Sequence, residues 1–287
     1  MNSNENETKQ NKQTHHTILP ILHELNNINK YDIILASNSP RRKELLNIMG
    51  LNSNIIRIIP SNFKENLNKN NYSKPSEYCL ATAIKKGENV IETKQTELKL
   101  QLCNNNTTAT DTDTTTSNTT NIVSTHMPIS ILICSDTIIE YDGHILEKPR
   151  DKAHAMEMLN MLSNNTHIVY TAVAIYMNKN NNKRNRQDGN SNSSDTVQEG
   201  EDGHQFEEEF QLKSHFISHS SVTFNHLSAL DIESYCNTSE PYDKAGGYGI
   251  QGLGSQLISS IRGDYYTIMG LPIHKLGCEL ALLVGDL

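Results

Sequence analysis

Residues 37–42 (SNSPRR) combine side chains that bind anions. The segment carries the hydroxyls of Ser37 and Ser39 and the guanidinium groups of Arg41 and Arg42, and it joins an apolar run, YDIILAS, to a helical pattern. Free backbone N–H groups and the positive end of a helix dipole at such a junction favour a phosphate, and guanidinium groups add charge-assisted hydrogen bonds. The alternative is an ordinary capped helix with two solvated arginines.

Residues 134–137 (CSDT) complete a strongly apolar run that predicts a buried strand over 129–134. They place the carboxylate of Asp136 and the hydroxyl of Thr137 at the expected end of this strand. Ligands of open α/β sheets bind beyond the carboxyl ends of the strands, where a carboxylate serves as a metal ligand or a general base. The alternative is an aspartate that caps a turn. Lys148 follows soon after and returns a cation toward the same region.

Residues 243–252 (DKAGGYGIQG) form a glycine-rich loop with the G-x-G-x-x-G spacing of dinucleotide-binding proteins. We reject that interpretation, because no strand precedes the loop, no clear helix follows it, and Pro272 stands where the ribose-binding acid is expected. What remains is a loop whose backbone can approach a ligand closely. Its Gln251 side chain both donates and accepts hydrogen bonds, which suits the edge of a nucleobase. A tight structural turn is the alternative.

The elements that must position these segments alternate between helices and strands. Amphipathic spacing and cap residues predict helices over residues 39–50, about 75–90, 151–162, 230–236 and from 272 onward. Apolar runs predict strands over residues 31–37, 129–134, 166–177, 216–224, about 256–261 and 265–269. Ser39 and Ser228 are predicted N-caps, Gly50 a helix end, and Asp142-Gly143 a hairpin turn. The fold class is therefore α/β with mixed strand pairing.

The composition separates a core from polar spacers. Hydrophobic residues make up 36% of the 287 residues, which is low beside the roughly 45–50% apolar content of globular domains. Three segments rich in Asn, Thr, Ser, Lys and Glu explain the deficit, since they cannot bury enough apolar area to offset the entropy of ordering. The predicted organisation is a disordered tail over 1–29 and a single domain over 30–287, with low-complexity insertions at about 101–125 and 178–211.

Charge and hydropathy exclude several classes of protein. A formal net charge of −8 without any sustained basic run argues against binding to nucleic acid. No stretch approaches the ~18 consecutive apolar residues of a membrane span, and the polar N-terminus lacks the apolar region of a secretory signal. We therefore expect a cytoplasmic protein with neither a nucleic-acid nor a membrane partner.

Three motifs in this order resemble the Maf family of nucleotide pyrophosphatases: LASNSPRRKELL, SDTIIEYDGHILEKPRDKAHAMEML and SEPYDKAGGYGIQGLG. The resemblance covers residues 31 to about 276 apart from the insertions. It implies an elongated, two-lobed α/β fold with a central cleft, similar to the inosine triphosphate pyrophosphatases. It also implies hydrolysis of a nucleoside triphosphate to the monophosphate and pyrophosphate with Mg²⁺ or Mn²⁺. The form of residues 243–252 matches the branch that acts on dTTP and UTP.

The resemblance also assigns roles to individual residues. The general base falls on Asp136, and the metal ligands fall on Glu65 and Asp136. The specificity positions fall on Arg41, Thr137 and Gln251. The other substrate-binding positions, which handle the phosphates, fall on Ser37, Ser39, Arg42, Lys86, Lys148 and Lys244.

The chain departs from the family pattern in two places. Cys134-Ser135 replaces the usual Gly-Ala before Asp136, and Asn164-Asn165 replaces a glycine-containing turn. The first change puts larger side chains beside the proposed base, which concerns the rate more than the reaction type.

The expected partners are the nucleoside triphosphate substrate and, from the resemblance, a second copy of the chain in a homodimer. Two other functions remain open. One is a pyrophosphatase for a modified or purine nucleotide. The other is a non-catalytic regulator that uses the same cleft to sense a nucleotide.

Overall fold

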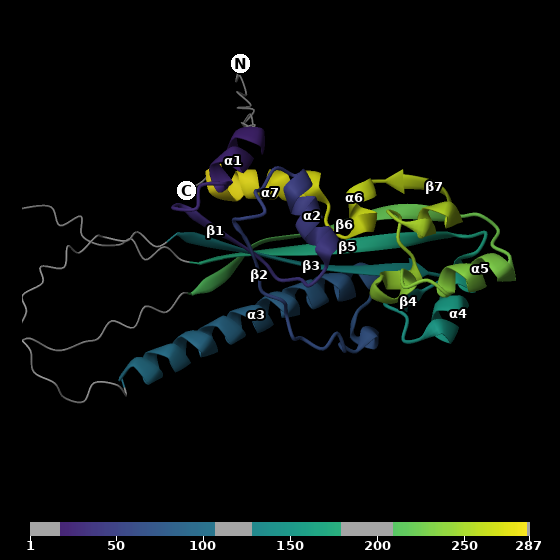
Figure 1. Ribbon diagram of the computed structural model, residues 1–287, viewed down its shortest axis with the longest axis horizontal. Coiled ribbons are helices and arrows are strands. Elements are labelled where there is room, and N and C mark those ends of the chain that lie inside the picture. Colours follow the sequence, from purple (N-terminus) through teal and green to yellow (C-terminus); the bar gives the residue numbers. More distant parts are fainter. Residues whose placement is uncertain (1–17, 107–127, 179–208, 286–287) are drawn as a thin grey trace, which may run out of the picture.

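The computed structural model describes residues 18–106, 128–178 and 209–285, in which helices cover both faces of one mixed sheet (Figure 1). The helices are α1 (Ile18–Leu25), α2 (Pro40–Ile48), α3 (Pro75–Asn106), α4 (Lys152–Leu162), α5 (Ala229–Cys236), α6 (Tyr265–Met269) and α7 (Ile273–Gly285). The strands are β1 (Tyr31–Leu35), β2 (Ile56–Ile58), β3 (Ile129–Tyr141), β4 (His144–Leu146), β5 (Thr166–Asn178), β6 (Phe210–Phe224) and β7 (Ile258–Gly263). Short 3₁₀ turns are η1 (Lys69–Asn71), η2 (Pro241–Asp243), η3 (Ala245–Gly247) and η4 (Leu253–Leu257).

The strands of the described residues lie in the order β2-β1-β3-β5-β6-β7, and β4 pairs with β3. β1 is parallel to β2 and β3, whereas β3, β5, β6 and β7 pair antiparallel. The three long strands β3, β5 and β6 span most of the long axis of the molecule (Figure 1). The mixed pairing expected from the sequence is confirmed.

Successive residues of the central strands point to opposite faces of the sheet, as the two-residue period of a strand requires. Ile33, Ile131 and Ile175 belong to a core that also contains residues of α1, α2 and α7. Ile34 and Leu132, one position further along, belong to a second core that contains a residue of α3. Because both faces are covered, these strands are apolar along nearly their whole length.

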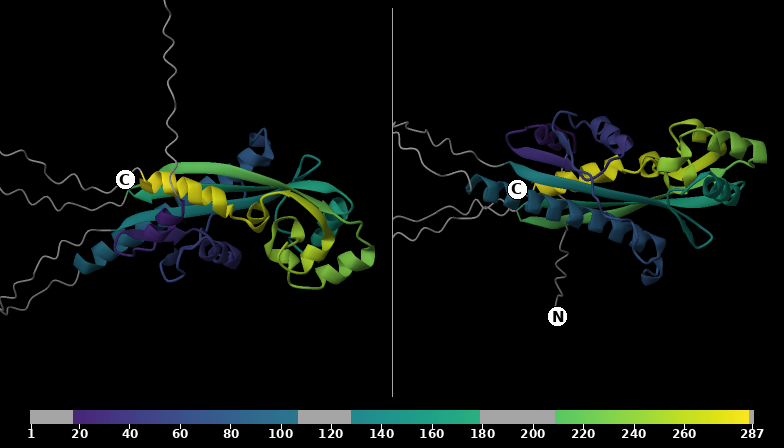
Figure 2. Two further views of the ribbon diagram at one scale, coloured as in Figure 1. Left: turned by 90° about the horizontal axis from the view of Figure 1, so that it is seen from above. Right: turned by 60° about the horizontal axis from the view of Figure 1, so that its bottom comes forward.

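The far ends of the long strands carry a separate core. Val169, Val222 and Phe224 pack there with Leu159 of α4 and Ile232 of α5. Figure 2 shows α4 and α5 at one end of the molecule and α1 at the other. The elongated, two-lobed α/β arrangement expected from the sequence is thereby confirmed.

Several local predictions are confirmed. Ser39 occupies the N-cap position of α2, and Gly50, with a φ of 104°, follows its end. Ser228 caps α5 with its side chain. Asp142 and Gly143 have φ angles of 49° and 76°, as a two-residue turn of the type that joins twisted antiparallel strands requires.

The strand predicted over residues 265–269 is wrong, because these residues form α6. The side chain of Asp264 accepts hydrogen bonds from the backbone N–H groups of Tyr266 and Thr267, and Gly270, with a φ of 107°, ends the helix. The two caps outweigh the strand propensity of the Tyr-Tyr-Thr-Ile sequence.

The disordered tail predicted over 1–29 is wrong for its last part, because residues 18–25 form α1. Leu22 and Leu25 are buried in the core that α7 shares. Burial of one apolar face in tertiary packing stabilises a short helix that its own propensity would not. Residues 1–17 lie outside the described part of the chain.

The two predicted insertions fall mostly outside the described residues, at 107–127 and 179–208. On their flanks, α3 continues to Asn106 rather than ending near residue 90, and β6 begins at Phe210 rather than at residue 216. In the three described ranges, no helix has the length and apolar character needed to cross a membrane.

Candidate active site

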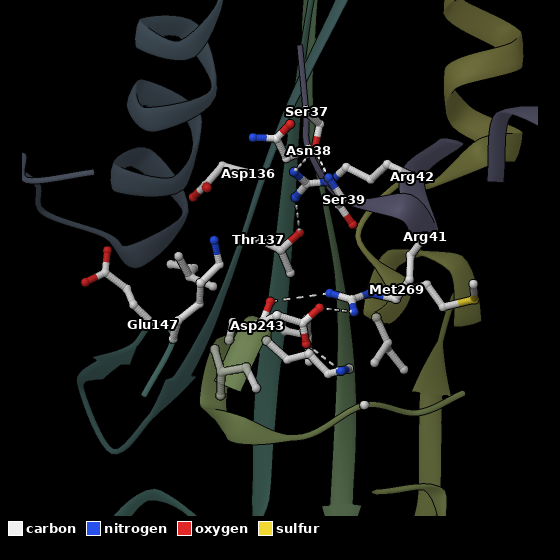
Figure 3. Close-up of a pocket in the computed structure, with 18 of the residues that line it drawn as sticks. Ser37, Asn38, Ser39, Arg41, Arg42, Asp136, Thr137, Glu147, Asp243 and Met269 are labelled. Atoms are coloured by element: carbon white, nitrogen blue, oxygen red, sulfur yellow. Dashed lines mark hydrogen bonds and ion pairs between the residues drawn. The ribbon is translucent and has the colours of Figure 1, made fainter. Parts of the chain in front are cut away.

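A cavity of about 370 Å³ lies where the two lobes meet, within the roughly 300–1,000 Å³ of small-ligand sites. Its walls come from the turn between β1 and α2, from α3 and β3, from the segment after β4 and from the loop at residues 243–251 (Figure 3). It collects all of the predicted site residues: Ser37, Ser39, Arg41, Arg42, Glu65, Lys86, Asp136, Thr137, Lys148, Lys244 and Gln251.

The two serines of the turn between β1 and α2 differ in their hydrogen bonds. Ser37 Oγ accepts hydrogen bonds from the N–H of Ser39 (3.1 Å) and from the guanidinium of Arg42 (3.2 Å), so it shapes the turn. Ser39 stands at the N-cap of α2, but its side chain makes no capping hydrogen bond. Its hydroxyl therefore stays available at the cavity wall, beside a helix N-terminus that favours an anion.

Arg42 is held in place by uncharged acceptors. Its Nε donates to the carbonyl of Gly270 at 2.9 Å, and its guanidinium donates to Ser37 Oγ and to Thr137 Oγ1, the latter at 3.1 Å. The Thr137 hydroxyl is in turn 3.0 Å from that of Thr171. Because these acceptors carry no net charge, they fix the direction of the guanidinium without neutralising it, and its charge acts on the cavity.

Lys86 lies between two carboxylates. Its Nζ is 2.6 Å from Asp136 Oδ1 and 2.8 Å from Glu65 Oε1, and Lys86 and Asp136 are only 8% and 4% exposed. Burial lowers the pKa of Lys86, but the charges of Asp136 and Glu65 raise it above its ordinary value. Burial raises the pKa of Glu65, but the charge of Lys86 lowers it below its ordinary value. Both groups are therefore charged at neutral pH.

The same pair of carboxylates fits a divalent cation. Mg²⁺ is commonly bound by one or two protein carboxylates together with substrate phosphates, and Asp136 and Glu65 lie side by side, each with one oxygen on Lys86 Nζ. In the described ranges, no group of three or more His, Cys, Asp or Glu side chains could hold a metal ion by itself. An ion beside Lys86 would thus be held by the remaining carboxylate oxygens of Asp136 and Glu65 and would depend on the oxygens of a bound phosphate chain.

Arg41 reaches across the cavity to the opposite lobe. Its Nη1 lies 2.8 Å from Asp243 Oδ2, and Lys244 Nζ lies 2.6 Å from the other oxygen of this carboxylate (Figure 3). Burial raises the pKa of Asp243, but its bonds to Lys244 and Arg41 lower it below the ordinary value. Because the Asp243 side chain is exposed to water, its ion pair with Arg41 is weak, on the order of 1 kcal/mol, so an incoming anion can replace Asp243 at Arg41.

The predicted position of Asp136 and Thr137 at a strand end is wrong. β3 continues to Tyr141, and Asp136 pairs in register with Ala172 of β5. On the other edge of β3, the pairing with β1 ends at Ile133 and the pairing with β4 begins only at Ile139. The two polar residues lie in this gap, so a missing neighbour strand, rather than the end of β3, gives them access to the cavity.

Residues that support the loop at 243–251 were missed by the sequence reasoning. The Tyr248 hydroxyl is 2.7 Å from His167 Nε2, and both rings pack edge-to-face with Phe224. The Tyr235 hydroxyl accepts a hydrogen bond from the N–H of Gly249 in this loop, and the Glu240 carboxylate accepts two from N–H groups of η4, which follows it. The sequence signal that could have indicated this support is the position of Glu240. Its carboxylate lies just before a glycine-rich segment whose backbone N–H groups need acceptors.

Comparison with known proteins identifies the family. Residues 32–283 match the model of the family described as Maf-like protein. A relative from Bacillus anthracis (strain CDC 684 / NRRL 3495), named dTTP/UTP pyrophosphatase, is 36% identical over 248 residues, which cover 86% of this chain and 93% of the relative. A protein of the same name from Bacillus cytotoxicus is 34% identical over 247 residues, with the same coverage. Since the match extends over nearly the whole of the two-lobed fold, the chain belongs to the Maf family.

Proposed function

We propose that this chain is a nucleoside triphosphate pyrophosphatase that hydrolyses dTTP and UTP to the monophosphate and pyrophosphate, as housekeeping of the nucleotide pool. One observation carries the proposal: in a Maf-family chain, a single cavity is lined by several cationic side chains, by two carboxylates that form ion pairs with Lys86, and by the loop that carries Gln251. The name of the relatives, dTTP/UTP pyrophosphatase, supports the choice of bases.

The triphosphate binds to the cations of the cavity. Arg42 and the N-terminus of α2 meet phosphate oxygens from one side, and Lys148 and Lys244 meet them from the other. Arg41 exchanges Asp243 for a phosphate oxygen. Transfer at phosphorus asks a protein mainly to position the chain and to neutralise its charge, and these side chains do both.

Asp136 serves as the general base. The oxygen of a water molecule attacks the α-phosphorus, the bond from this phosphorus to the bridging oxygen breaks, and pyrophosphate leaves with the electron pair, while Asp136 takes a proton from the water. Lys86, 2.6 Å from Asp136 Oδ1, fixes the orientation of the carboxylate. The second oxygen of Asp136 is the one we assign to the water.

Glu65 and Asp136 are the residues that would hold Mg²⁺ or Mn²⁺, with phosphate oxygens completing the ligand set. Such a cation, when bound, supplies positive charge to the phosphate chain. Gln251 is an exposed residue of the loop at 243–251, and its side chain reads the base edge by offering both a donor and an acceptor.

Release of pyrophosphate from a panel of nucleotides tests the proposal. The purified chain is incubated with Mg²⁺ and UTP, dTTP, CTP, ATP, GTP or modified triphosphates, and kcat/KM is measured for each. The highest values are expected for UTP and dTTP. A preference for a purine or modified nucleotide would contradict the choice of substrate, and tight binding without pyrophosphate release would point to a nucleotide-sensing regulator.

Two further expectations from the sequence stay predictions. Light scattering of the purified chain tests the homodimer, and imaging of a fluorescent fusion tests the cytoplasmic location.

A further inference from the structure

The side chain that we propose to read the base is not itself held in place. Gln251 is exposed, as are its neighbours Gly252 and Leu253, and its amide makes no hydrogen bond within the described part of the chain. A free side chain on an exposed turn can discriminate between bases only if the backbone beneath it is fixed. The position of Gln251 must therefore be set by the residues on either side of it.

Glu240 holds the segment that follows Gln251. Its Oε2 accepts a hydrogen bond from the N–H of Leu253 at 2.8 Å, and its Oε1 accepts one from the N–H of Gly254 at 3.0 Å. Burial raises the pKa of Glu240, but these N–H groups lower it below the ordinary value, so the carboxylate is charged at neutral pH. Hydrogen bonds to an ionised acceptor are roughly twice as strong as those between neutral groups.

Tyr235 holds the segment that precedes Gln251. Its hydroxyl accepts a hydrogen bond from the N–H of Gly249 at 3.1 Å and donates one to Glu240 Oε1 at 2.9 Å. The backbone before and after Gln251 is thus tied to one tyrosine–glutamate pair, which we call the loop clamp (Tyr235 and Glu240).

Glycines allow this close approach. A Cβ atom at Gly252 would collide with the carboxylate of Glu240, and one at Gly254 would lie 2.7 Å from the hydroxyl of Tyr235. The loop clamp therefore gives a reason for both glycines. Gly252 is the last glycine of the rejected G-x-G-x-x-G motif, and Gly254 lies outside that motif.

We propose that Glu240, acting with Tyr235, is a positioning residue that sets the place of Gln251 and thereby the preference of the enzyme for uracil and thymine bases. The inference rests on the proposed function. Neither clamp residue lines the cavity, so neither touches the substrate. Of the phosphate-binding cations, Lys244 donates a hydrogen bond to the backbone carbonyl of Glu240, which a change of the Glu240 side chain does not remove. Loss of the loop clamp changes base discrimination more than the chemistry at phosphorus.

The substitution Glu240→Gln tests the clamp with little change of shape. All three partners of the carboxylate are donors: the hydroxyl of Tyr235 and the N–H groups of Leu253 and Gly254. An amide keeps one acceptor oxygen and turns an NH₂ group toward a donor, so one side of the loop is released. The bond from Lys244 to the backbone carbonyl of residue 240 does not depend on the side chain.

The measurement is the ratio of kcat/KM for UTP to that for CTP. We expect Glu240→Gln to lower this ratio about tenfold, in line with the cost of losing a hydrogen bond to a charged group, while kcat for CTP changes little. Tyr235→Phe releases the Gly249 side and should lower the ratio in the same direction. The double variant should lose little more than Glu240→Gln alone, because both residues act as one unit. Glu233→Gln, the same change on the exposed face of α5, is the matched control and should leave the ratio unchanged.

Binding of non-hydrolysable UTP and CTP analogues gives the same ratio without turnover and separates the two proposals. If the wild-type chain prefers the UTP analogue and loses this preference in the clamp variants, yet releases no pyrophosphate, the clamp is supported and the proposed function is wrong. If folded Tyr235→Phe and Glu240→Gln both keep the wild-type ratio, the clamp has no part in base choice. If Glu240→Gln does not fold, Tyr235→Phe decides alone.

Discussion

Replacing Asp136 with asparagine removes the basicity and the charge of the carboxylate while keeping its shape. The residue is 4% exposed and its Oδ1 lies 2.6 Å from Lys86 Nζ, so the change falls on a buried ion pair. Lys86 keeps Glu65 as a charged partner at 2.8 Å, and the amide oxygen of an asparagine can still accept a hydrogen bond from it.

The expected effects differ for folding, turnover and binding. Breaking a buried ion pair costs about 3–5 kcal/mol when a charge is left alone, and here the remaining partner keeps the loss below that range. A general base is worth roughly 10²–10⁴-fold in rate, so kcat should fall by at least about 100-fold. Binding of the triphosphate should persist, because the substitution removes a negative charge that repels the phosphate chain.

The assay pairs single-turnover release of pyrophosphate with equilibrium binding of a non-hydrolysable UTP analogue. Asp32→Asn is the matched control. Asp32 is a partly buried carboxylate at the start of β1, its side chain is 18% exposed, and it forms an ion pair with Arg57 outside the cavity. This variant should keep wild-type turnover. The comparison shows whether a fall in kcat comes from losing the base in the cavity or from losing any partly buried carboxylate.

Two results would refute the reasoning. If Asp136→Asn turns over within a few-fold of the wild type, the residue is a structural partner of Lys86 and the base is another group. If the variant is folded but no longer binds the analogue, the main role of Asp136 is to hold the metal and substrate rather than to take the proton.

Three other predictions concern the loop, the buried histidine and the second insertion. Gln251→Ala should lower the kcat/KM ratio of UTP to CTP about tenfold, since an amide discriminates by its hydrogen-bond pattern; an unchanged ratio would remove it from the base site. Burial lowers the pKa of His167 from 6.5 to about 3, so between these values the unfolded chain binds a proton that the folded chain does not, and stability is lost as the pH falls. His167→Gln should abolish about 2 kcal/mol of the loss between pH 7.5 and pH 5, measured by urea unfolding at both pH values; an equally acid-sensitive variant would contradict this. Replacing residues 179–208 with Asn-Gly should leave turnover intact, because Asn178 and Phe210 are register partners that a short turn can join. The shorter loop costs less entropy to close, so stability should rise by at most about 2 kcal/mol. A large drop in Tm would show that the insertion packs on the core.

Local structure was predictable wherever neighbouring residues decide it. The apolar run, serine and proline before α2 predict a strand, a turn and a helix in succession, and Ser228 predicts the start of α5. Local propensity gave the wrong prediction over residues 265–269. These residues have strand propensity, but the caps at Asp264 and Gly270 make them a helix. Cap geometry depends on the backbone beyond the segment, which propensity alone does not include.

The candidate site residues were found by motif and resemblance, and the geometry between them came only from the fold. Lys86 meets Asp136 because α3 packs on the face of β3, and Arg41 meets Asp243 across 202 positions of the chain. No sequence pattern predicted that both carboxylates of the site would share one ammonium group.

The sequence by itself identified the candidate residues for the chemistry, most of the local elements that hold them and the family to which the motifs are similar. The tertiary structure decided that Asp136 lies in mid-strand, in the gap between β1 and β4, and that Tyr235 and Glu240 tie down the loop of Gln251. The physical reason is that such contacts are set by the order and the register of the strands. Strand order and register depend in turn on burial and hydrogen bonding summed over segments far apart in the chain.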